Sequence, residues 1–329
     1  MSGGQAATGV AFRDDLKGMT EELSFDELGL MGDKVATPVP VTDVSAYFPT
    51  LPREAVGKVP DTRRQSDGSF QRGQWEYGQD TYISQEYGFE EPIDITKRLE
   101  NLKWFDEETQ AAQLAVQGLK LGRVNRIASA LFNTTTFTGL TGYKAITEEW
   151  DDATSAVPWA DIDGVSATLR KKCGIQKKFQ SLILTWDNID QIIRCDEITG
   201  HAKYVEIVPM LPMEQKIQWL ASYFGVKEIV PVMSVYDAAA QGVDFSYAHS
   251  WSNEYGMICV LDKTPNLKSR TVICQPVFTP YAKDYLIESY EEPKVKKQII
   301  RAAEHRSVKT RADFGVLIGN MKTTVSQGV

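Results

Sequence analysis

The pattern of apolar positions is clearest between Asp106 and Phe132, where it has the spacing of a long α-helix. Asp106 is a suitable N-cap, and Glu107 and Glu108 place negative charge in the first turn, where the helix dipole favours it. The apolar residues form two seams: Leu114, Leu121, Val124, Ala128 and Leu131 on one, and Ala112, Val116, Leu119, Ile127 and Ala130 on the other. At about 1.5 Å per residue this helix would be roughly 40 Å long. We therefore predict a central strut that is packed from two sides.

Beyond this helix, short apolar runs alternate with amphipathic segments. A second helix is predicted from a cap at Asp161 to Gly174, a residue type that commonly ends helices. Further segments are predicted as strands at 181–185, 227–233, 256–261 and 270–276, and as helices at 187–194 and 213–224. The tail is strand-like through 285–290 and 295–318, and we expect it to return to the long helix. The pattern as a whole predicts an α+β fold.

The first part of the chain has a different pattern. Residues 1–52 mix glycine, acidic residues and prolines, and we expect an arm with little core of its own. Residues 53–73 are polar and rich in turn formers, and 74–87 alternate aromatic with polar side chains. This predicts a long two-stranded excursion with an exposed tip near 66–69. After Pro92 we expect a short helix capped by Asp94.

Composition and charge narrow the function classes. The chain has 329 residues, of which 42% are hydrophobic and 24% charged, as in folded soluble proteins. The net charge of −8 argues against a general nucleic-acid coat, which needs a basic surface. No apolar run reaches the ~20 residues of a membrane helix, and the N-terminus lacks the apolar core of a secretory signal. We expect synthesis in the cytoplasm without export.

The sequence offers little for catalysis. It has three histidines and four widely spaced cysteines, and no Cys-x-x-Cys pair. It also lacks the glycine-rich phosphate-binding, zinc-protease, serine-hydrolase and calcium-loop motifs. Structural thiols are favoured over a metal or disulfide framework at Cys173, Cys195, Cys259 and Cys274. No catalytic residue, metal or cofactor is predicted; the enzymatic alternative is a cytoplasmic hydrolase that uses Cys195, near His201, or Cys259.

Two surface segments carry candidate binding residues. The aromatic, polar loop 245–254 contains Tyr247 and Trp251, and we favour a protein interface there over a cup for a small ligand. Near the predicted excursion tip, Arg63, Arg64 and Arg72 fit an ion-pairing surface better than a phosphate patch, because acidic residues lie beside them. Trp75 and Tyr77 follow these arginines and complete the candidate interface set.

The order of these elements resembles the major capsid protein of tailed bacteriophages, the Hong Kong 97 type fold. Residues 82–133, "YISQEYGFEEPIDITKRLENLKWFDEETQAAQLAVQGLKLGRVNRIASALFN", look like that family's descending hairpin strand and spine helix. "EEWDDATSAVPWADID" at 148–163 is similar to the opening of its second peripheral helix. "SLILTWDNIDQIIR" at 181–194 resembles the entry into its axial domain, and "ADFGVLIGNM" at 312–321 resembles a closing strand.

The resemblance implies an architecture and no chemistry. It implies an N-terminal arm at 1–53, an extended loop at 54–88, a peripheral domain at 89–175 and 281–325, and an axial domain at 176–280. The subunits would form pentamers and hexamers that close into an icosahedral virion shell around double-stranded DNA, bound without specific recognition. Candidate subunit-interface residues are then Arg63, Arg64, Arg72, Trp75, Tyr77, Tyr247 and Trp251.

Partners and alternatives follow from the same resemblance. The short arm leaves no room for a scaffolding segment, so we expect a separate scaffolding protein or none, together with a portal and a decoration protein. Carboxylates on a neighbour, at Glu90, Glu91 or 106–108, could pair with the loop arginines. An encapsulin-type nanocompartment shares the fold and is the first alternative to a phage head.

Overall fold

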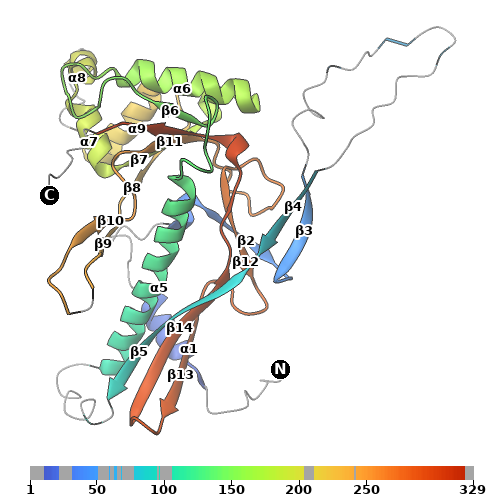
Figure 1. The fold of residues 1–329 in the computed structure, drawn as a ribbon, viewed down its shortest axis with the longest axis vertical. Coiled ribbons are helices and arrows are strands. Elements are labelled where there is room, and N and C mark those ends of the chain that lie inside the picture. The colour runs from blue at the N-terminus through green and yellow to red at the C-terminus, as the bar shows by residue number, and fades with distance from the viewer. Residues whose placement is uncertain are drawn as a thin grey trace.

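The computed structural model describes residues 11–21, 32–50, 59, 63, 64, 68, 78–94, 96, 106–203, 211–240 and 242–322. Its longest element is helix α5 (Glu107–Leu131), which joins the two main parts of the molecule (Figure 1). The Asp106 carboxylate caps this helix and accepts hydrogen bonds from the Glu108 amide at 3.2 Å and the Thr109 hydroxyl at 2.6 Å. At the other end, the Asn133 side chain accepts from the Thr135 amide at 2.8 Å. The predicted long helix is therefore confirmed together with its cap.

Helix α5 contributes residues to two different hydrophobic cores. In its first half, Ala112, Val116 and Leu119 pack against Ile287 and Ile300 of one sheet. In its second half, buried residues pack beneath another sheet: Val124, Ile127, Ala128 and Leu131. The two-sided packing was predicted, but the first seam was wrong at Leu114, which is exposed. The physical reason is that each half of the helix meets a different neighbour, so the buried face shifts along its length.

A seven-stranded sheet covers the first half of α5. Its main order is β1-β13-β14-β12-β15, with β2 parallel to β12 and β5 antiparallel to β14. The strands are β1 (Ala11–Phe12), β2 (Thr37–Val41), β5 (Gln85–Asp94), β12 (Ile273–Phe278), β13 (Leu286–Glu292), β14 (Lys297–Arg306) and β15 (Lys309–Thr310). Helix α1 (Asp14–Glu21) packs on α5 beside β13. The tail therefore returns to the long helix, as predicted.

The segment around Pro92 is a strand, and the short helix expected after it stays a prediction. Pro92 lies inside β5 and stands opposite Ile299 of β14. Strand β5 pairs only with β14 among the described strands, so it is an edge strand, where a proline does not break a ladder hydrogen bond. Asp94 ends the strand and accepts a hydrogen bond from the Thr96 amide at 2.8 Å. The predicted helix beyond it falls mostly outside the described residues.

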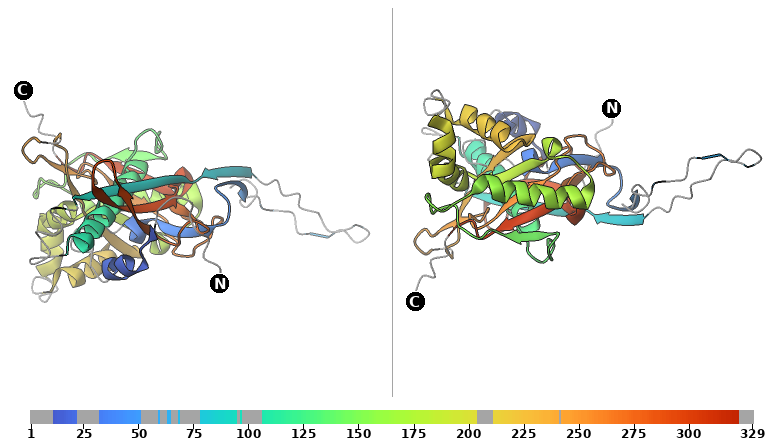
Figure 2. Two further views of the ribbon diagram at one scale, coloured as in Figure 1. Left: turned by 90° about the horizontal axis from the view of Figure 1, so that it is seen from below. Right: turned by 90° about the horizontal axis from the view of Figure 1, so that it is seen from above.

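A five-stranded sheet forms the other part of the molecule. Its order is β6-β16-β11-β7-β8. The strands are β6 (Tyr143–Ala145), β7 (Ser181–Thr185), β8 (Glu228–Val232), β11 (Gly256–Cys259) and β16 (Gly315–Gly319). The helices of this part are α6 (Pro158–Cys173), α7 (Trp186–Arg194), α8 (Asp196–Lys203) and α9 (Met213–Phe224). They lie at the same end of the molecule as this sheet (Figures 1 and 2).

Local signals explain where helix α6 begins and ends. It begins at Pro158 rather than at Asp161. Proline is favoured at the first helical position because it has no backbone N–H, and an N–H there would have no acceptor within the helix. Asp161 instead accepts a hydrogen bond from the buried indole of Trp150 at 3.1 Å. The helix ends at Gly174, whose φ of 74° is a left-handed conformation that glycine adopts most readily.

Strand pairing changes the predicted division of the chain. β6, α6 and β16 were assigned to the peripheral part, yet they belong to the five-stranded sheet and its core. Conversely, β12 was assigned to the axial part but lies in the seven-stranded sheet. The reason is that these strands pair with partners far away in sequence, and such pairings cannot be inferred from local patterns.

Two small hairpins complete the fold. β3 (Ser45–Thr50) pairs with β4 (Gly78–Ile83), and β9 (Val235–Asp237) pairs with β10 (Tyr247–His249). β3 comes from the predicted arm, so the arm contributes more structure than expected. It also supplies a short helix, α2 (Gly32–Val35), that lies against α5. A Cβ at Gly32 would stand 2.7 Å from Ile127 Cδ1, so glycine permits this close approach.

Candidate functional site: interface hairpins and a buried charge cluster

The β9–β10 hairpin presents exposed apolar side chains in a fixed arrangement. Tyr247 is 78% exposed, and Phe245 is 57% exposed with its ring edge-on to that of Tyr247 at 4.6 Å. The Asp237 carboxylate accepts hydrogen bonds from the amides of Ser246 and Ala239, both at 2.9 Å. These bonds, first the one from Ser246, lower the pKa of Asp237 below its usual value. These hydrogen bonds hold the two sides of the hairpin tip together.

Trp251 differs from its expected role. It is only 2% exposed and packs edge-on against Phe132 at 5.2 Å, in the core under the five-stranded sheet. Trp251 follows β10 closely, and at this residue the chain re-enters the core after the hairpin. Trp251 is therefore a core residue of this subunit, which corrects its assignment to a subunit interface.

The other candidate interface residues lie between β3 and β4 in the sequence. Arg63 and Arg64 are exposed, and Arg64 Nε donates a hydrogen bond to the Gly68 carbonyl at 3.1 Å. Arg72, Trp75 and Tyr77 lie outside the described residues.

The base of the β3–β4 hairpin is fixed to the body. Phe48 and Tyr82 pack with Val41 in a small cluster. Lys309 Nζ lies 2.6 Å from Asp80 Oδ1 and so ties β15 to β4. Burial alone would raise the pKa of Asp80, but the Lys309 hydrogen bond and the Thr81 amide outweigh it, and the net shift is downward. The base of this hairpin is thus anchored to the body.

Several carboxylates proposed to receive a neighbour's arginines already have partners inside the subunit. Glu90 accepts a hydrogen bond from the Tyr290 hydroxyl at 3.1 Å and lies 3.5 Å from Arg301. Glu108 lies 3.0 Å from Arg13, and Asp106 caps α5. These internal contacts make the three residues less available for pairing between subunits.

A charge cluster around the buried residues Arg123, Arg306 and Glu304 joins the arm, α5 and the seven-stranded sheet. Its members are three arginines and three carboxylates: Arg123, Arg126, Arg306, Asp33, Asp284 and Glu304. Arg123 is 4% exposed and lies 2.9 Å from Asp33 and 3.0 Å from Asp284. Glu304 is fully buried and forms ion pairs with Arg123 and, at 2.6 Å, with Arg126. Charges taken out of water must be paired in this way to be tolerated.

Gln275 and Arg306 complete the cluster. Gln275 donates to Asp33 at 2.8 Å and to the Ala36 carbonyl at 2.7 Å, and it accepts from Arg306 at 3.3 Å. Burial raises the pKa of Asp284, but the charges of Arg123 and Arg306 outweigh burial and lower it overall. Burial is the largest influence on Arg126 and Arg306 and lowers the pKa of each guanidinium. The cluster therefore fixes where the arm contacts α5.

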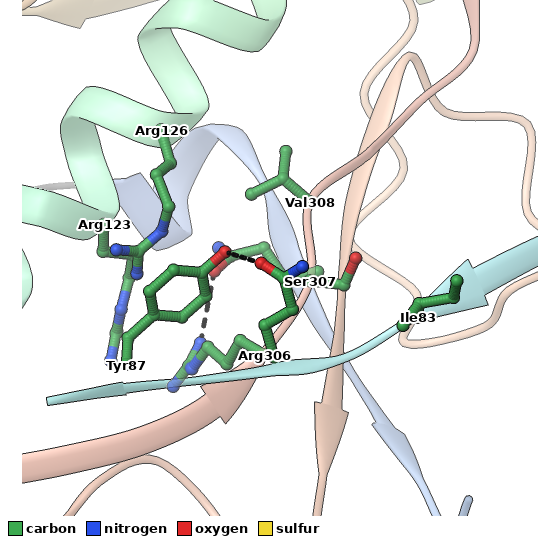
Figure 3. A pocket seen from close by; sticks show the side chains of 9 residues that line it. Ile83, Tyr87, Arg123, Arg126, Arg306, Ser307 and Val308 are labelled. Atoms are coloured by element: carbon green, nitrogen blue, oxygen red, sulfur yellow. Dashed lines mark hydrogen bonds between the residues drawn. The ribbon is translucent and has the colours of Figure 1, made fainter. Parts of the chain in front are cut away.

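A cavity of about 260 Å³ opens beside this cluster. Figure 3 shows Arg123 and Arg126 reaching from α5 toward the ring of Tyr87, with Arg306 on another side. The Arg126 guanidinium lies 3.6 Å from the centre of that ring, a stacking distance. The Tyr87 hydroxyl donates to Gln85 Oε1 at 2.9 Å.

The cysteines lie in surroundings that oppose catalysis. All four are free thiols, and Cys195, Cys259 and Cys274 are buried. Burial is the main cause that raises the pKa of Cys195 to about 11, and it raises that of Cys259 further. A thiolate is the reactive form, so these shifts disfavour a nucleophile. The His201 ring lies 5.4 Å from the Tyr223 ring and is tilted against it by 50°.

The described residues show neither a cluster of metal ligands nor a membrane-spanning helix. No group of three or more histidine, cysteine or acidic side chains there is placed to hold a metal ion. Within the same residues, no helix combines the length and apolarity needed to cross a bilayer.

Sequence reasoning missed the charge cluster, although a local signal exists. Arg123 lies four residues from Leu119 and four from Ile127, so a charged side chain occupies a core position of the helix. Glu304 and Arg306 share a strand face with the buried residues Ile300 and Ala302. Opposite charges at core-facing positions of two elements indicate a buried ion pair.

Comparison with known proteins gives a clear result for structure only. No family model matches the chain, and no curated protein sequence matches it. A phage-related protein from Bordetella bronchiseptica RB50 superimposes with a TM-score of 0.67 at 14% identity, over 94% of this chain and 98% of that one. The capsid protein of cyanophage P-SCSP1u superimposes with a TM-score of 0.53 at 10% identity, over 97% of this chain and 90% of that one. An encapsulin complex from Synechococcus elongatus PCC 7942 gives 0.50 at 9% identity, over 90% and 89%.

Proposed function

We propose that this chain, which has the Hong Kong 97 type capsid fold, is a major capsid protein that assembles into the icosahedral head of a phage. The observation that carries the proposal is the extent of the likeness to the cyanophage capsid protein, which covers 97% of this chain. The predicted α+β capsid fold is confirmed by this likeness and by that to the phage-related protein. Pentamers and hexamers that enclose double-stranded DNA belong to the proposal.

The β9–β10 hairpin supports an assembly role. Val243, Phe245 and Tyr247 are large, exposed and close together in the chain. Soluble monomers rarely expose such a group, and exposed aromatic side chains often mark protein interfaces. We propose that this tip contacts the equivalent tips of neighbouring subunits within a pentamer or hexamer. The hydrogen bonds to Asp237 already order the tip, so less conformational entropy would be lost when subunits assemble.

The β3–β4 hairpin supports the same proposal. An isolated two-stranded hairpin is marginally stable, so its anchored base at Asp80 and Phe48 suits a segment that makes its remaining contacts on another subunit. Arg63, Arg64 and Arg72 would then contact carboxylates of that subunit. Because Glu90, Asp106 and Glu108 have partners of their own, Glu91 is the better partner among the carboxylates considered.

The proposed role needs no catalysis and no cofactor. The raised pKa of Cys195 and Cys259 speaks against the hydrolase alternative. The proposed partners are further copies of the chain, a portal, and a scaffolding or decoration protein, with DNA held without specific contacts. The proposed location is the virion.

A second candidate is the shell of an encapsulin-type compartment, favoured by the likeness to the encapsulin complex. The two candidates differ in what the particle encloses. Particles purified from the natural source would contain double-stranded DNA in the first case and a protein cargo in the second. A portal gene and a terminase gene beside this one would also favour the phage head.

The test is assembly of the expressed chain, alone and with its neighbouring gene products. We expect closed shells or capsomers by negative-stain microscopy and analytical sedimentation. The double variant Phe245→Ser, Tyr247→Ser should keep the unfolding midpoint of the subunit and reduce assembly at least tenfold. Val295→Ser, an exposed apolar residue at the β13–β14 turn, is the matched control and should assemble normally. A chain that stays monomeric at every salt and pH tried would contradict the proposal.

A further inference from the structure

The cavity beside the charge cluster has a one-sided chemistry. Arg123, Arg126 and Arg306 line it, and none of its described lining residues is acidic. The three carboxylates of the cluster contact the guanidinium groups from outside this lining. The cavity wall is therefore positive, although the cluster contains equal numbers of both charges.

The polar groups of the lining are mainly hydrogen-bond donors. Arg126 donates one hydrogen bond, to Glu304, and its other N–H groups have no acceptor among the described residues. Gln85 accepts from Tyr87 through Oε1, which leaves its amide N–H groups for another partner. The Ser307 hydroxyl has no hydrogen-bond partner in the described part of the chain.

The remaining polar groups act as supports. Gln275 already donates to Asp33 and Ala36 and accepts from Arg306, so it holds the wall in place. Stacking on Tyr87 fixes the plane of the Arg126 guanidinium. A guanidinium held in one plane is well suited to bind two oxygens of one anion. The volume of about 260 Å³ exceeds that of several water molecules, each about 30 Å³ in the liquid.

We propose that this cavity is an oxyanion site, in which Arg126, Gln85 and Ser307 bind a carboxylate or a phosphate group. The lowered pKa of Arg126 and Arg306 agrees with this, since burial there penalises the cation and an anion would relieve the penalty. The group could be a free ion or an acidic side chain of a second copy of the chain. The site itself does not depend on the proposed shell function.

The primary test is calorimetric titration of inorganic phosphate into the unassembled full-length chain at low salt. We expect saturable binding at one site per chain. Gln85→Glu places a carboxylate at the cavity, beside Arg126, and should weaken phosphate binding at least tenfold, about 1.4 kcal/mol. Gln85 is exposed and this change removes no ion pair, so the variant should fold normally. Absence of saturable binding would overturn the proposal.

Two further variants locate the site. Arg126→Gln should also weaken binding at least tenfold, whereas Arg194→Gln, which alters an exposed arginine on α7, should leave it unchanged. Binding that survives both cavity substitutions would place the phosphate elsewhere and refute the assignment.

Titration of assembled particles separates the two sources of the anion. If the natural ligand is a free ion, particles bind phosphate as the unassembled chain does. If it is a neighbour's carboxylate, assembly removes phosphate binding, because the cavity is already filled. Failure of the chain to assemble would count against the proposed shell, and the titration of the unassembled chain would still decide the site.

Discussion

Replacing Arg123 with methionine tests whether the buried charge cluster stabilises the subunit. Methionine keeps most of the aliphatic stem but removes the guanidinium that pairs with Asp33, Asp284 and Glu304. Removing one partner of a buried ion pair costs about 3–5 kcal/mol, because a buried charge is left without compensation. Glu304 keeps Arg126 at 2.6 Å, so we expect the lower end, about 3 kcal/mol. This loss is large, because the total free energy of unfolding of a typical domain is only about 5–15 kcal/mol.

The assay is urea unfolding of the unassembled chain at pH 7, followed by tryptophan fluorescence. Arg194→Met is the matched control, because Arg194 is exposed and pairs with Asp190 one turn away; its effect should stay below about 0.5 kcal/mol. The double variant Arg123→Met, Glu304→Gln should be less destabilised than the sum of the two single variants, since it also removes the uncompensated charge. A loss below about 1 kcal/mol for Arg123→Met alone would refute the reasoning.

The remaining predictions concern acid, the core and two glycines. The folded-state pKa of Asp284 lies below its unfolded value. Its stabilisation is therefore complete above the ordinary carboxyl pKa of about 4 and is lost as the pH falls from there through the folded-state pKa. Asp284→Asn should flatten the fall of the unfolding midpoint below about pH 4. Ile127→Ala should lower the free energy of unfolding, measured in urea, by about 2–5 kcal/mol, because Ile127 is buried. Leu114→Ala on the same helix should lower it by less than about 1 kcal/mol, because Leu114 is exposed. Gly174→Ala forces alanine into a left-handed conformation and should lower the melting temperature, whereas Gly200→Ala, with open space for a Cβ in helix α8, should not.

The elements most accessible to sequence reasoning were those specified locally. The bounds of α5 followed from Asp106, two acidic residues and an apolar period, and α9 was predicted at the residues where it lies. Strand β7 is buried throughout and was also predicted at its observed bounds. Signals of this kind act within a few residues, so no tertiary contact is needed to interpret them. The predicted burial of Leu114 was wrong, because its exposure depends on which sheet lies beside each half of the helix.

Long-range pairing explains what could not be predicted. Strand β12 pairs in parallel with β2, more than two-thirds of the chain away, and β16 lies between β6 and β11. Trp251 has an aromatic, interface-like neighbourhood in sequence, yet its partner Phe132 ends the long helix in space.

The charge cluster follows the same rule. Asp33, Arg123 and Glu304 lie in the arm, the helix and the closing sheet, and each alone is an ordinary surface-type residue in sequence. Burial of Arg123 and Glu304 is tolerated only when the three residues meet, because a buried charge needs an opposite charge beside it. A single-residue signal can therefore mark Arg123 as unusual on an apolar face, but only the fold can supply its partners.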